Sequence, residues 1–364
     1  MILAHISDLH LGMHFKNISF IDDQKIILND ILTILIENKA DGLIIAGDIY
    51  DTALATNDAI SLFNDFLNKL YLNNIKVYMI AGNHDNGQRV SFGNELLVNS
   101  NIYISNNFEI TKDIRVVHED DTDIYLLPFI KPLMVKKYYD LETDDYNHAL
   151  KIVIDNLNID HNKKNILVAH QFITNALRCD SEDITIGGLD NVDAGVFDDF
   201  DYVALGHLHR PQNITDKIRY SGSILKYSFS ERNDHKSITF IDTRDFSKSY
   251  VELNMIHDFI QIKGYYNEIM DDEDMIDKNA YLHIILKDEK EIPYAYDHLE
   301  QIFPNLMVLS YEHKRYNAES VEMINDKADP IDIVADFYKM MNNETLDDKQ
   351  EVYLKKMIEK VWNK

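Results

Sequence analysis

Cysteine, proline and glycine are scarce in this sequence. Its 364 residues include one cysteine, Cys179, with six prolines and twelve glycines. A single cysteine permits no internal disulfide and fits a reducing compartment, and we interpret Cys179 as a loop residue rather than a catalytic thiol. Because breakers of regular structure are few and 45% of the residues are hydrophobic, we expect a well-buried core with at least one accessory domain.

Long hydrophobic runs are also missing. No segment approaches the roughly eighteen apolar residues that a membrane span requires, so we expect no membrane association. The first residues, Ile2 to Ile6, read as a strand and are followed by Asp8, which differs from the charged and then apolar start of a secretory signal. We therefore expect a cytoplasmic protein.

The sequence does contain short polar fragments that come at or after brief apolar runs. These runs are Ile2 to Ile6, Leu43 to Ala46, Val77 to Ala81, Ile166 to Ala169 and Tyr202 to Leu205. Their length, and the Gly, Asp and Asn residues that bound them, predict strands buried on both faces. The fragments are Asp8-Leu9-His10, Gly47-Asp48, Gly82-Asn83-His84-Asp85, Ala169-His170 and Gly206-His207-Leu208-His209. Because sites in open α/β sheets lie beyond the carboxyl ends of the strands, we expect the fragments to converge.

The converging side chains would combine aspartates, an asparagine and histidines. Such an oxygen and nitrogen set suits Mn²⁺ or Fe²⁺ better than a closed four-ligand zinc site, which relies more on Cys. The donors are too many for one ion, whereas two ions about 3.5 to 4 Å apart, bridged by one carboxylate, would use them all. A single His after a strand is usually a core or loop residue. Several such coincidences in sequence order favour a two-metal site for phosphoester hydrolysis.

These fragments resemble the signature of the calcineurin-like metallophosphoesterases. The longer stretches Ser7 to Gly12, Gly47 to Asp51 and Ala204 to His209 resemble more narrowly the SbcD nucleases of that superfamily, which work with the ATPase SbcC in bacterial DNA repair. The resemblance extends from Met1 to the last predicted helix. It implies an α/β fold: a layered metallophosphoesterase β-sandwich flanked by helices, with a small α/β capping domain and a C-terminal helical hairpin.

The resemblance also implies the metal ligands. One ion would be held by Asp8, His10, Asp48 and His209, and the other by Asp48, Asn83, His170 and His207. The cofactors would be two divalent metal ions, with Mn²⁺ expected, and Asp48 would bridge them. His84 is implied as a catalytic residue that protonates the leaving oxygen or stabilises the transition state, rather than as a ligand.

Other polar residues near the fragments have less certain roles. Asp51 and Asp85 either orient imidazoles behind the ligands or cap loops, and the sequence favours neither. His5 lies within the first predicted strand and is expected in the core. His14 is left undecided.

Two apolar stripes predict core-facing helices. They consist of Ile27, Ile31, Ile34 and Leu35, and of Ile60, Phe63, Leu67 and Leu70. The alternation of strands and helices to about residue 105 indicates a layered domain with mostly parallel strands. Strands at Ile124 to Leu127, Ile166 to Ala169, Tyr202 to Leu205 and Ser237 to Asp242 are expected to form a second sheet, with Ser221-Gly222-Ser223 in a turn near the site.

We expect a nuclease domain at residues 1–254, a capping domain at 255–313, a linker at 314–328 and a helical hairpin at 329–364. In the capping domain, the pattern predicts strands at Phe259 to Lys263, Tyr281 to Leu286 and Met307 to Ser310, a helix at Tyr294 to Phe303 and a solvated loop at Asp271 to Asp274. The resemblance implies that this domain selects the substrate. The alternative is a passive packing module.

The end of the sequence predicts two amphipathic helices. Asp329-Pro330 is typical of a helix start, and Thr345 with Asp348 forms a capping box for the second helix. Their apolar faces could fold back on the chain or bind another helical protein. The resemblance favours docking on the coiled coil of an SbcC-like ATPase of the SMC type, and it implies a homodimer within a heterotetramer.

The formal charge of −26 is unfavourable for a DNA-binding enzyme, because nonspecific affinity for a duplex comes mainly from Lys and Arg. Basic residues expected in or near the loops around the site are Lys16, Arg89, Lys131, Arg210 and Lys226. Each of them could equally be a solvated surface charge. We expect the chain alone to bind DNA weakly and a basic partner to supply the rest.

The sequence thus favours a DNA phosphodiesterase: the ATP-dependent double-strand exonuclease and hairpin or single-strand endonuclease subunit of a complex for DNA end processing, repair and recombination. The first alternative is a free-standing metallophosphoesterase that acts on nucleotides or phosphoproteins. It is disfavoured because a small-molecule phosphatase needs no docking helices. A noncatalytic adaptor of the ATPase is disfavoured because no ligand position is substituted.

Overall fold

The computed structural model describes residues 1–15, 18–139, 145–174, 176–180, 182, 191–312, 350 and 354. The chain divides into two units, Met1–Tyr311 and Glu312–Lys364. Nearly all described residues belong to the first unit, to which the following account refers. The predicted hairpin at 329–364 lies outside the described residues, apart from Gln350 and Leu354.

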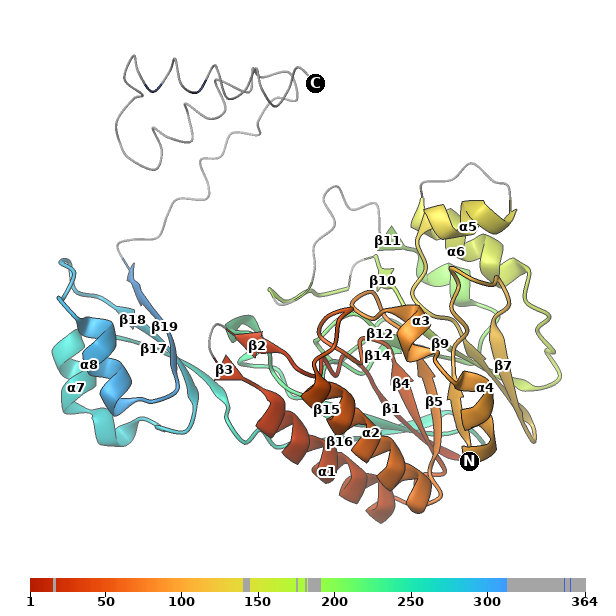
Figure 1. Ribbon diagram of the computed structural model, residues 1–364, viewed down its shortest axis with the longest axis horizontal. Helices are drawn as coiled ribbons and strands as arrows, with labels where there is room; N and C mark the ends of the chain where they lie inside the picture. The colour runs from red at the N-terminus through yellow and green to blue at the C-terminus, as the bar shows by residue number, and fades with distance from the viewer. Residues whose placement is uncertain are drawn as a thin grey trace. The chain divides into compact units, whose positions relative to one another are not determined.

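The first sheet has the strand order β16-β15-β1-β4-β5-β6. These strands are β1 (Ile2–Ile6), β4 (Gly42–Ala46), β5 (Lys76–Ile80), β6 (Ile102–Ile104), β15 (Ser237–Asp242) and β16 (Ser247–Glu252). Strands β1, β4, β5 and β6 run parallel, and α1 (Ile21–Glu37) and α2 (Asn57–Leu72) lie along the sheet in Figure 1. The parallel order predicted to about residue 105 is therefore present.

One predicted strand lies in the other sheet. The sequence placed Ser237 to Asp242 in the second sheet, whereas β15 pairs antiparallel with β1 in the first, with Ile2 opposite Asp242. An apolar alternation predicts a strand but not its hydrogen-bonding partner, which here depends on pairing between residues that are far apart in the sequence.

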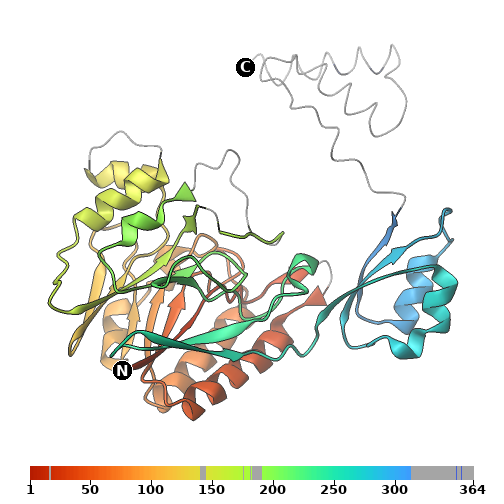
Figure 2. The ribbon, with the colours of Figure 1, turned by 180° about the vertical axis from the view of Figure 1, so that it is seen from behind.

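The second sheet has the order β13-β14-β12-β9-β8-β7. Its strands are β7 (Arg115–Glu119), β8 (Thr122–Leu126), β9 (Lys164–His170), β12 (Tyr202–Gly206), β13 (Gln212–Asn213) and β14 (Ile218–Tyr220). Helices α5 (Pro132–Tyr139) and α6 (Tyr146–Asp155) pack against this sheet (Figure 2). Shorter elements are β2 (His14–Phe15), β3 (Ile18–Ser19), α3 (Gly87–Val90), α4 (Asn94–Leu97), β10 (Phe172–Ile173) and β11 (Asn191–Val192).

The two sheets pack face to face, so the central strands are buried on both sides. In β4, Leu43 and Ile45 face the core under α1 and α2, whereas Ile44 and Ala46 face the core between the sheets. Alternate residues of a strand point to opposite faces, which explains why this strand reads as a continuous apolar run. The layered sandwich flanked by helices that the sequence predicted is confirmed.

The two predicted helices exist, but one stripe differs in detail. In α1, Ile27, Ile31 and Leu35 are buried. In α2 the buried face includes Phe66, whereas Ile60, predicted to face the core, is 46% exposed. The prediction counted the helical spacing from Ile60. In the structure, Thr56 caps the helix by accepting from the Ala59 N–H, and the buried face passes through Ala59 and Phe63 instead.

Residues 259–311 form a separate small sheet with helices. Strands β17 (Phe259–Gly264), β18 (Tyr281–Leu286) and β19 (Leu306–Tyr311) run parallel, and α7 (Tyr266–Asp271) and α8 (Ala295–Ile302) connect them. The acidic stretch predicted as a loop instead contains the end of α7 and a 3₁₀ turn at Glu273–Met275. Within the described ranges, every helix is too short or too polar to span a bilayer.

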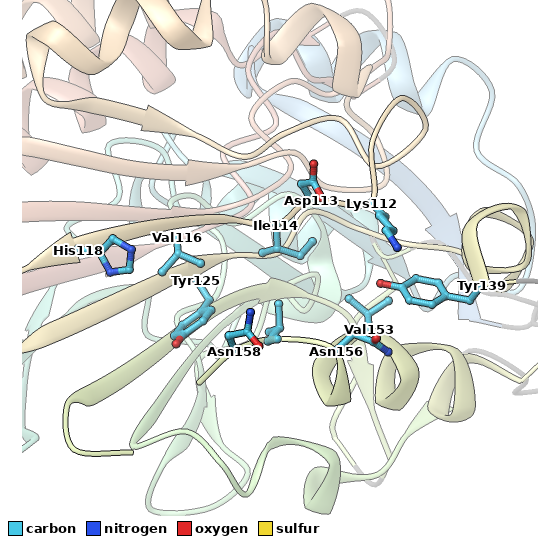
Figure 3. A pocket seen from close by; sticks show the side chains of 11 residues that line it. Lys112, Asp113, Ile114, Val116, His118, Tyr125, Tyr139, Val153, Asn156 and Asn158 are labelled. Atoms are coloured by element: carbon cyan, nitrogen blue, oxygen red, sulfur yellow. The ribbon is translucent and has the colours of Figure 1, made fainter. Parts of the chain in front are cut away.

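A cavity of about 370 Å³ opens between the segment leading into β7 and the end of α6. Figure 3 shows its lining, which includes Lys112, His118, Tyr125, Tyr139 and Asn156. Its lining side chains include none of the predicted site residues. The predicted site residues lie elsewhere, at the carboxyl ends of the strands.

Candidate metal centre

The predicted ligands all follow the carboxyl ends of strands that neighbour one another in the two packed sheets. Asp8 and His10 follow β1, Asp48 follows β4, Asn83 follows β5, His170 is the last residue of β9, and His207 and His209 follow β12. The parallel arrangement of β1, β4 and β5, and of β9 and β12, brings these ends to common edges. The side chains that the sequence predicted to converge therefore lie together.

One group of donors contains Asp8, His10 and His209. Each offers one ligand atom, and these atoms lie within 4.8 Å of one another. The Nε2 atoms of His10 and His209 are 3.1 Å apart. Two imidazole nitrogens and a carboxylate that face one point are a suitable donor set for a divalent ion.

A second group surrounds the amide of Asn83. Its Oδ1 atom lies 2.9 Å from Nε2 of His170 and 2.9 Å from Nδ1 of His207. The carboxylate of Asp48 lies between the two groups: its Oδ2 atom is 3.2 Å from His170 Nε2 and 3.7 Å from His10 Nε2. Asp48 is thus placed to contribute to both groups, and the residues present fit a pair of divalent ions.

The backbone at this centre is strained. Asp8, His10, Asp48 and His207 have φ angles of 52°, 42°, 49° and 102°. Such conformations cost about 1 to 3 kcal/mol each for residues other than glycine and persist where the surrounding structure imposes them. Four of the seven predicted ligands have such conformations. The placement of their side chains therefore lowers the stability of the fold.

Glycines allow the loops to approach closely. A Cβ atom on Gly206 would lie 2.0 Å from the carbonyl oxygen of Ala46, and one on Gly82 would lie 2.1 Å from Oδ1 of Asp48. Gly222, at φ +80°, lets the turn at Ser221 to Ser223 approach the carbonyl oxygen of His209. The turn that the sequence placed near the site is therefore next to a predicted ligand.

Hydrogen bonds fix the orientation of the His170 ring. Its Nδ1 donates to the carbonyl oxygen of Ala46 at 2.8 Å, which leaves Nε2 for Asp48 and Asn83. Burial by itself would lower the pKa of His170, but the carboxylates of Asp48 and Asp8 and the Ala46 carbonyl oxygen together outweigh burial and raise that pKa to about 9. Burial lowers the pKa of His207 to about 3 and that of His10 well below its ordinary value, so both rings carry lone pairs at neutral pH.

His84 stands beside both groups. Its backbone N–H donates to Oδ1 of Asp48 at 2.9 Å, and its ring lies edge-on to the ring of His10, with 4.8 Å between the centroids. Its Nδ1 donates to the carbonyl oxygen of Asp51 at 2.8 Å. A ligand atom of His84 also lies within 4.8 Å of ligand atoms of His10 and Asp48, so position alone does not separate coordination from catalysis.

The structure separates the two acids whose roles were open. Asp85 accepts backbone N–H groups from Ile49, Tyr50 and Gly82 at 2.9 to 3.1 Å, so it caps the loops. The Oδ1 atom of Asp51 lies 3.7 Å from Nδ1 of His10. The other ring nitrogen of His10, Nε2, is the one that faces His209. At this distance from Asp51 no hydrogen bond forms, and Nδ1 of His10 has no hydrogen-bond partner among the described residues, so the orienting role of Asp51 stays a prediction.

The two other histidines close to the first polar fragment, His5 and His14, lie away from the donors. His5 is fully buried and its Nδ1 lies 3.1 Å from the hydroxyl of Tyr202, which is the expected core position. His14 is exposed in β2, and its Nδ1 donates to the carbonyl oxygen of Gly12 at 2.7 Å.

Two adjacent residues in the first turn of α1, which the sequence did not single out, connect the centre with residues 255–311. The Nε2 atom of Gln24 donates to the carbonyl oxygen of His10 at 2.7 Å, and its Oε1 accepts from the N–H of Gly12 at 2.9 Å. Asp23 accepts from Nδ1 of His257 at 2.8 Å and from the hydroxyl of Tyr281 at 3.0 Å. Asp23 and Gln24 lie four and three residues before Ile27 and so fall on the same helix face. This spacing signals that they are buried but not which groups they contact.

Behind His209 lies a second set that sequence reasoning missed: Glu182, Glu231 and Lys236. Glu231 and Lys236 are 0% and 1% exposed, and Glu182 is 7% exposed. Burial by itself would raise the pKa of Glu231, but the charge of Lys236 holds that pKa well below its usual value. No spacing in the sequence indicates that these residues meet His209.

The basic residues expected around the site differ in their contacts. Arg210 pairs with Asp234 at 2.9 Å and Lys226 with Asp258 at 2.7 Å, so their charges are largely compensated. Arg89 and Lys131 are exposed, and Lys16 lies outside the described residues. Two of the five expected contributors to a positive surface are therefore neutralised within the chain.

Comparison with known proteins identifies the class to which this site belongs. Residues 1–211 match the family model described as calcineurin-like phosphoesterase. This match covers more than half of the sequence, and the chain belongs to the calcineurin-like phosphoesterase family. Residues 255–342 match the model of the SbcD C-terminal domain, described as the type 5 capsule protein repressor C-terminal domain.

Two solved structures show distant likenesses to this chain. A dimetal phosphatase from Danio rerio is similar over 71% of this chain and 97% of its own, with 10% identity and a TM-score of 0.44. A β-glucosidase from Micrococcus antarcticus is similar over 84% of this chain and 82% of its own, with 8% identity and a TM-score of 0.24. At TM-scores this low, neither likeness bears on the function of this chain.

Proposed function

We propose that this protein is a two-metal DNA phosphodiesterase of the SbcD type, which works with an SbcC-like ATPase in DNA end processing, repair and recombination. The observation that carries the proposal is the position of Asp48 between the Asp8, His10 and His209 group and the Asn83, His170 and His207 group. The match of residues 255–342 to the SbcD C-terminal domain supports DNA as the substrate over a small phosphoester.

Seven residues would hold the ions, here proposed to be Mn²⁺. Asp8, His10, Asp48 and His209 would take one, and Asp48, Asn83, His170 and His207 the other. Two divalent ions in such a pair supply an activated water nucleophile and neutralise charge on the phosphoryl oxygens.

His84 would act on the leaving group. Because its Nδ1–H is engaged by the Asp51 carbonyl oxygen, the proton delivered to the leaving oxygen would come from Nε2 of the imidazolium form. The hydrogen bond from its backbone N–H to Asp48 fixes the distance between the ring and the two donor groups. Proton transfer of this kind is worth roughly 10²- to 10⁴-fold in rate.

We also propose a separate role for each segment of the chain. Residues 1–254 would form the nuclease domain, 255–313 the capping domain that positions DNA, 314–328 a linker, and 329–364 a helical hairpin that binds the ATPase. The start of the SbcD C-terminal match at residue 255 supports the first boundary. We further propose a homodimer within a heterotetramer.

A free-standing phosphoesterase is the second candidate. It is favoured by the formal charge of −26 and by the compensation of Arg210 and Lys226 within the chain, both of which weaken attraction to DNA. The same donors would serve a nucleotide or a phosphoprotein.

Substrate preference separates the two candidates. The purified chain would be assayed with Mn²⁺ on a labelled duplex, a DNA hairpin and a generic phosphomonoester, with and without an SbcC-like ATPase. We expect cleavage of hairpin or single-stranded DNA by the chain alone, and ATP-dependent degradation of duplex ends with the partner. Efficient hydrolysis of the phosphomonoester with no cleavage of DNA under either condition would contradict the proposal.

A further inference from the structure

Glu231 and Lys236 form a fully buried ion pair behind the first donor group. The Nζ atom of Lys236 lies 2.6 Å from Oε2 of Glu231, and both side chains have 0% exposure. Lys236 also donates to the hydroxyl of Ser223 at 2.9 Å. The pair is therefore a fixed part of the interior and makes no contact with solvent.

Stability alone does not account for such a pair. Removing two charges from water carries a large desolvation penalty, and replacement of a buried ion pair by apolar side chains of similar volume is often neutral or stabilising. The role of the pair therefore depends on the residues that it contacts rather than on its own contribution to the free energy of folding.

Both members contact His209. The Oε1 atom of Glu231 lies 3.5 Å from Nδ1 of the His209 ring, and Nζ of Lys236 donates to the His209 carbonyl oxygen at 2.7 Å. In addition, Oε1 of Glu182 accepts the His209 backbone N–H at 2.7 Å. The backbone N–H, the backbone carbonyl and Nδ1 of one residue are thus held by three buried charged side chains.

This leaves Nε2 of His209 on the side of the donor group, 3.1 Å from Nε2 of His10. A carboxylate that accepts from one ring nitrogen keeps the proton there, fixes the ring and makes the other nitrogen a better ligand. Glu231 is placed to accept from Nδ1 of His209 in this way.

We propose that Glu231 and Lys236 are positioning residues for the first metal site, where they hold His209 with its proton on Nδ1 and its Nε2 lone pair toward the ion. This inference rests on the metal centre proposed above. Lys236 pairs with Glu231 and anchors the His209 main chain, while Glu231 sets the orientation of the His209 ring. Neither residue touches the substrate or an ion.

Metal binding by a neutralised variant tests the proposal. Because Glu231→Gln alone would leave the Lys236 charge buried without its partner, the variant is Glu231→Leu with Lys236→Met. Mn²⁺ binding would be followed by calorimetry and by elemental analysis after dialysis. We expect one of two Mn²⁺ sites to weaken roughly 10- to 100-fold, as for loss of other supporting carboxylates, while the second is unchanged. Two sites of unaltered affinity in a folded variant would overturn the proposal.

Two control variants separate this effect from general damage. Glu119→Gln removes the acid that pairs with Lys76 and Tyr78, away from the donors, and should leave both Mn²⁺ affinities unchanged. His209→Ala removes the ligand itself and should abolish the first site. If His209→Ala binds two ions normally, the proposed metal centre fails. If it loses one ion but the double variant does not, only the role of Glu231 and Lys236 fails.

The wild-type protein provides a measurement that does not depend on a variant folding. In the metal-free chain, histidine ¹⁵N chemical shifts and long-range couplings report which ring nitrogen carries the proton. We expect Nδ1 of His209 to be protonated. A neutral His209 ring protonated only at Nε2 would refute the proposal.

Discussion

The Nδ1 atom of His84 donates to the main-chain carbonyl oxygen of Asp51 across 2.8 Å. The hydrogen bond joins the loop after β5 to the loop after β4 and engages Nδ1 of the His84 ring. The ring is therefore held in one orientation beside Asp48 and His10, whether it transfers a proton or binds an ion. Metal content and turnover distinguish these two roles.

Replacement of His84 by Ser should preserve two ions per chain and DNA binding while lowering kcat by roughly 10²- to 10⁴-fold, because a proton donor is lost but no ligand. Elemental analysis, a DNA-binding isotherm and single-turnover rates provide the measurements. If the variant loses an ion, His84 is a ligand and the catalytic assignment is wrong.

Asp48→Asn should weaken both ions and abolish hydrolysis while leaving the fold intact. The carboxylate lies between the two donor groups, and an amide oxygen cannot supply the charge that a bridge between two cations requires. Circular dichroism checks the fold, and metal content and DNA cleavage check the site. Normal metal content and activity would exclude Asp48 as the bridge.

Gly206→Ala should be far more harmful than Gly195→Ala. A Cβ atom at Gly206 would lie 2.0 Å from the Ala46 carbonyl oxygen and 2.8 Å from Nδ1 of His170, whereas the nearest atom at Gly195 is 3.4 Å away. Strain of this kind costs about 1 to 3 kcal/mol, and we expect a lower Tm with a weakened second metal site. Equal Tm values and equal metal binding in the two variants would show that the close packing is not required.

Cys179 should be chemically inert in the folded protein. Burial, with the negative charges of Glu231, Glu182 and Asp234 nearby, raises the pKa of its thiol to about 12, so the reactive thiolate is almost absent at pH 8. Alkylation by iodoacetamide should become fast only after unfolding, and Cys179→Ser should retain activity. Rapid labelling of the native chain would contradict the buried position.

Deletion of residues 329–364 should abolish copurification with the ATPase and any stimulation by ATP, while Mn²⁺-dependent cleavage of short hairpin DNA stays near normal. If these residues complete the core instead, the Tm should fall by many degrees, since each lost apolar contact costs roughly 2 to 5 kcal/mol. A truncated chain that unfolds, or that still binds the ATPase at full strength, would exclude the docking role.

The strand ends were predictable from sequence because local signals determine them. A short apolar run followed by a polar or glycine residue indicates where a buried strand stops, and the runs that end at Ala46 and Ala169 place Asp48 and His170 without knowledge of the topology. The sheet to which Ser237–Asp242 belongs was predicted wrongly, since pairing with β1 joins residues more than two hundred positions apart. Local pattern does not determine partners at that separation.

The same reasoning explains which site residues were missed. Glu231 and Lys236 lie in a polar stretch, and each alone reads as a surface charge. Only the fold shows that they are buried together against His209. Gln24 was hidden for a similar reason: its amide reaches the loop after β1 from the first turn of α1, a contact that no spacing rule describes.

Because Asp23 and Gln24 are adjacent, replacing or displacing residues 255–311 should affect the loop that carries His10. One residue receives hydrogen bonds from His257 and Tyr281, and the next holds the main chain at His10. A displacement that pulls on the first would shift the second, because both belong to one helical turn. A chimaera that takes residues 255–311 from a relative should therefore disturb the loop that carries His10, unless the incoming segment offers Asp23 two equivalent donors.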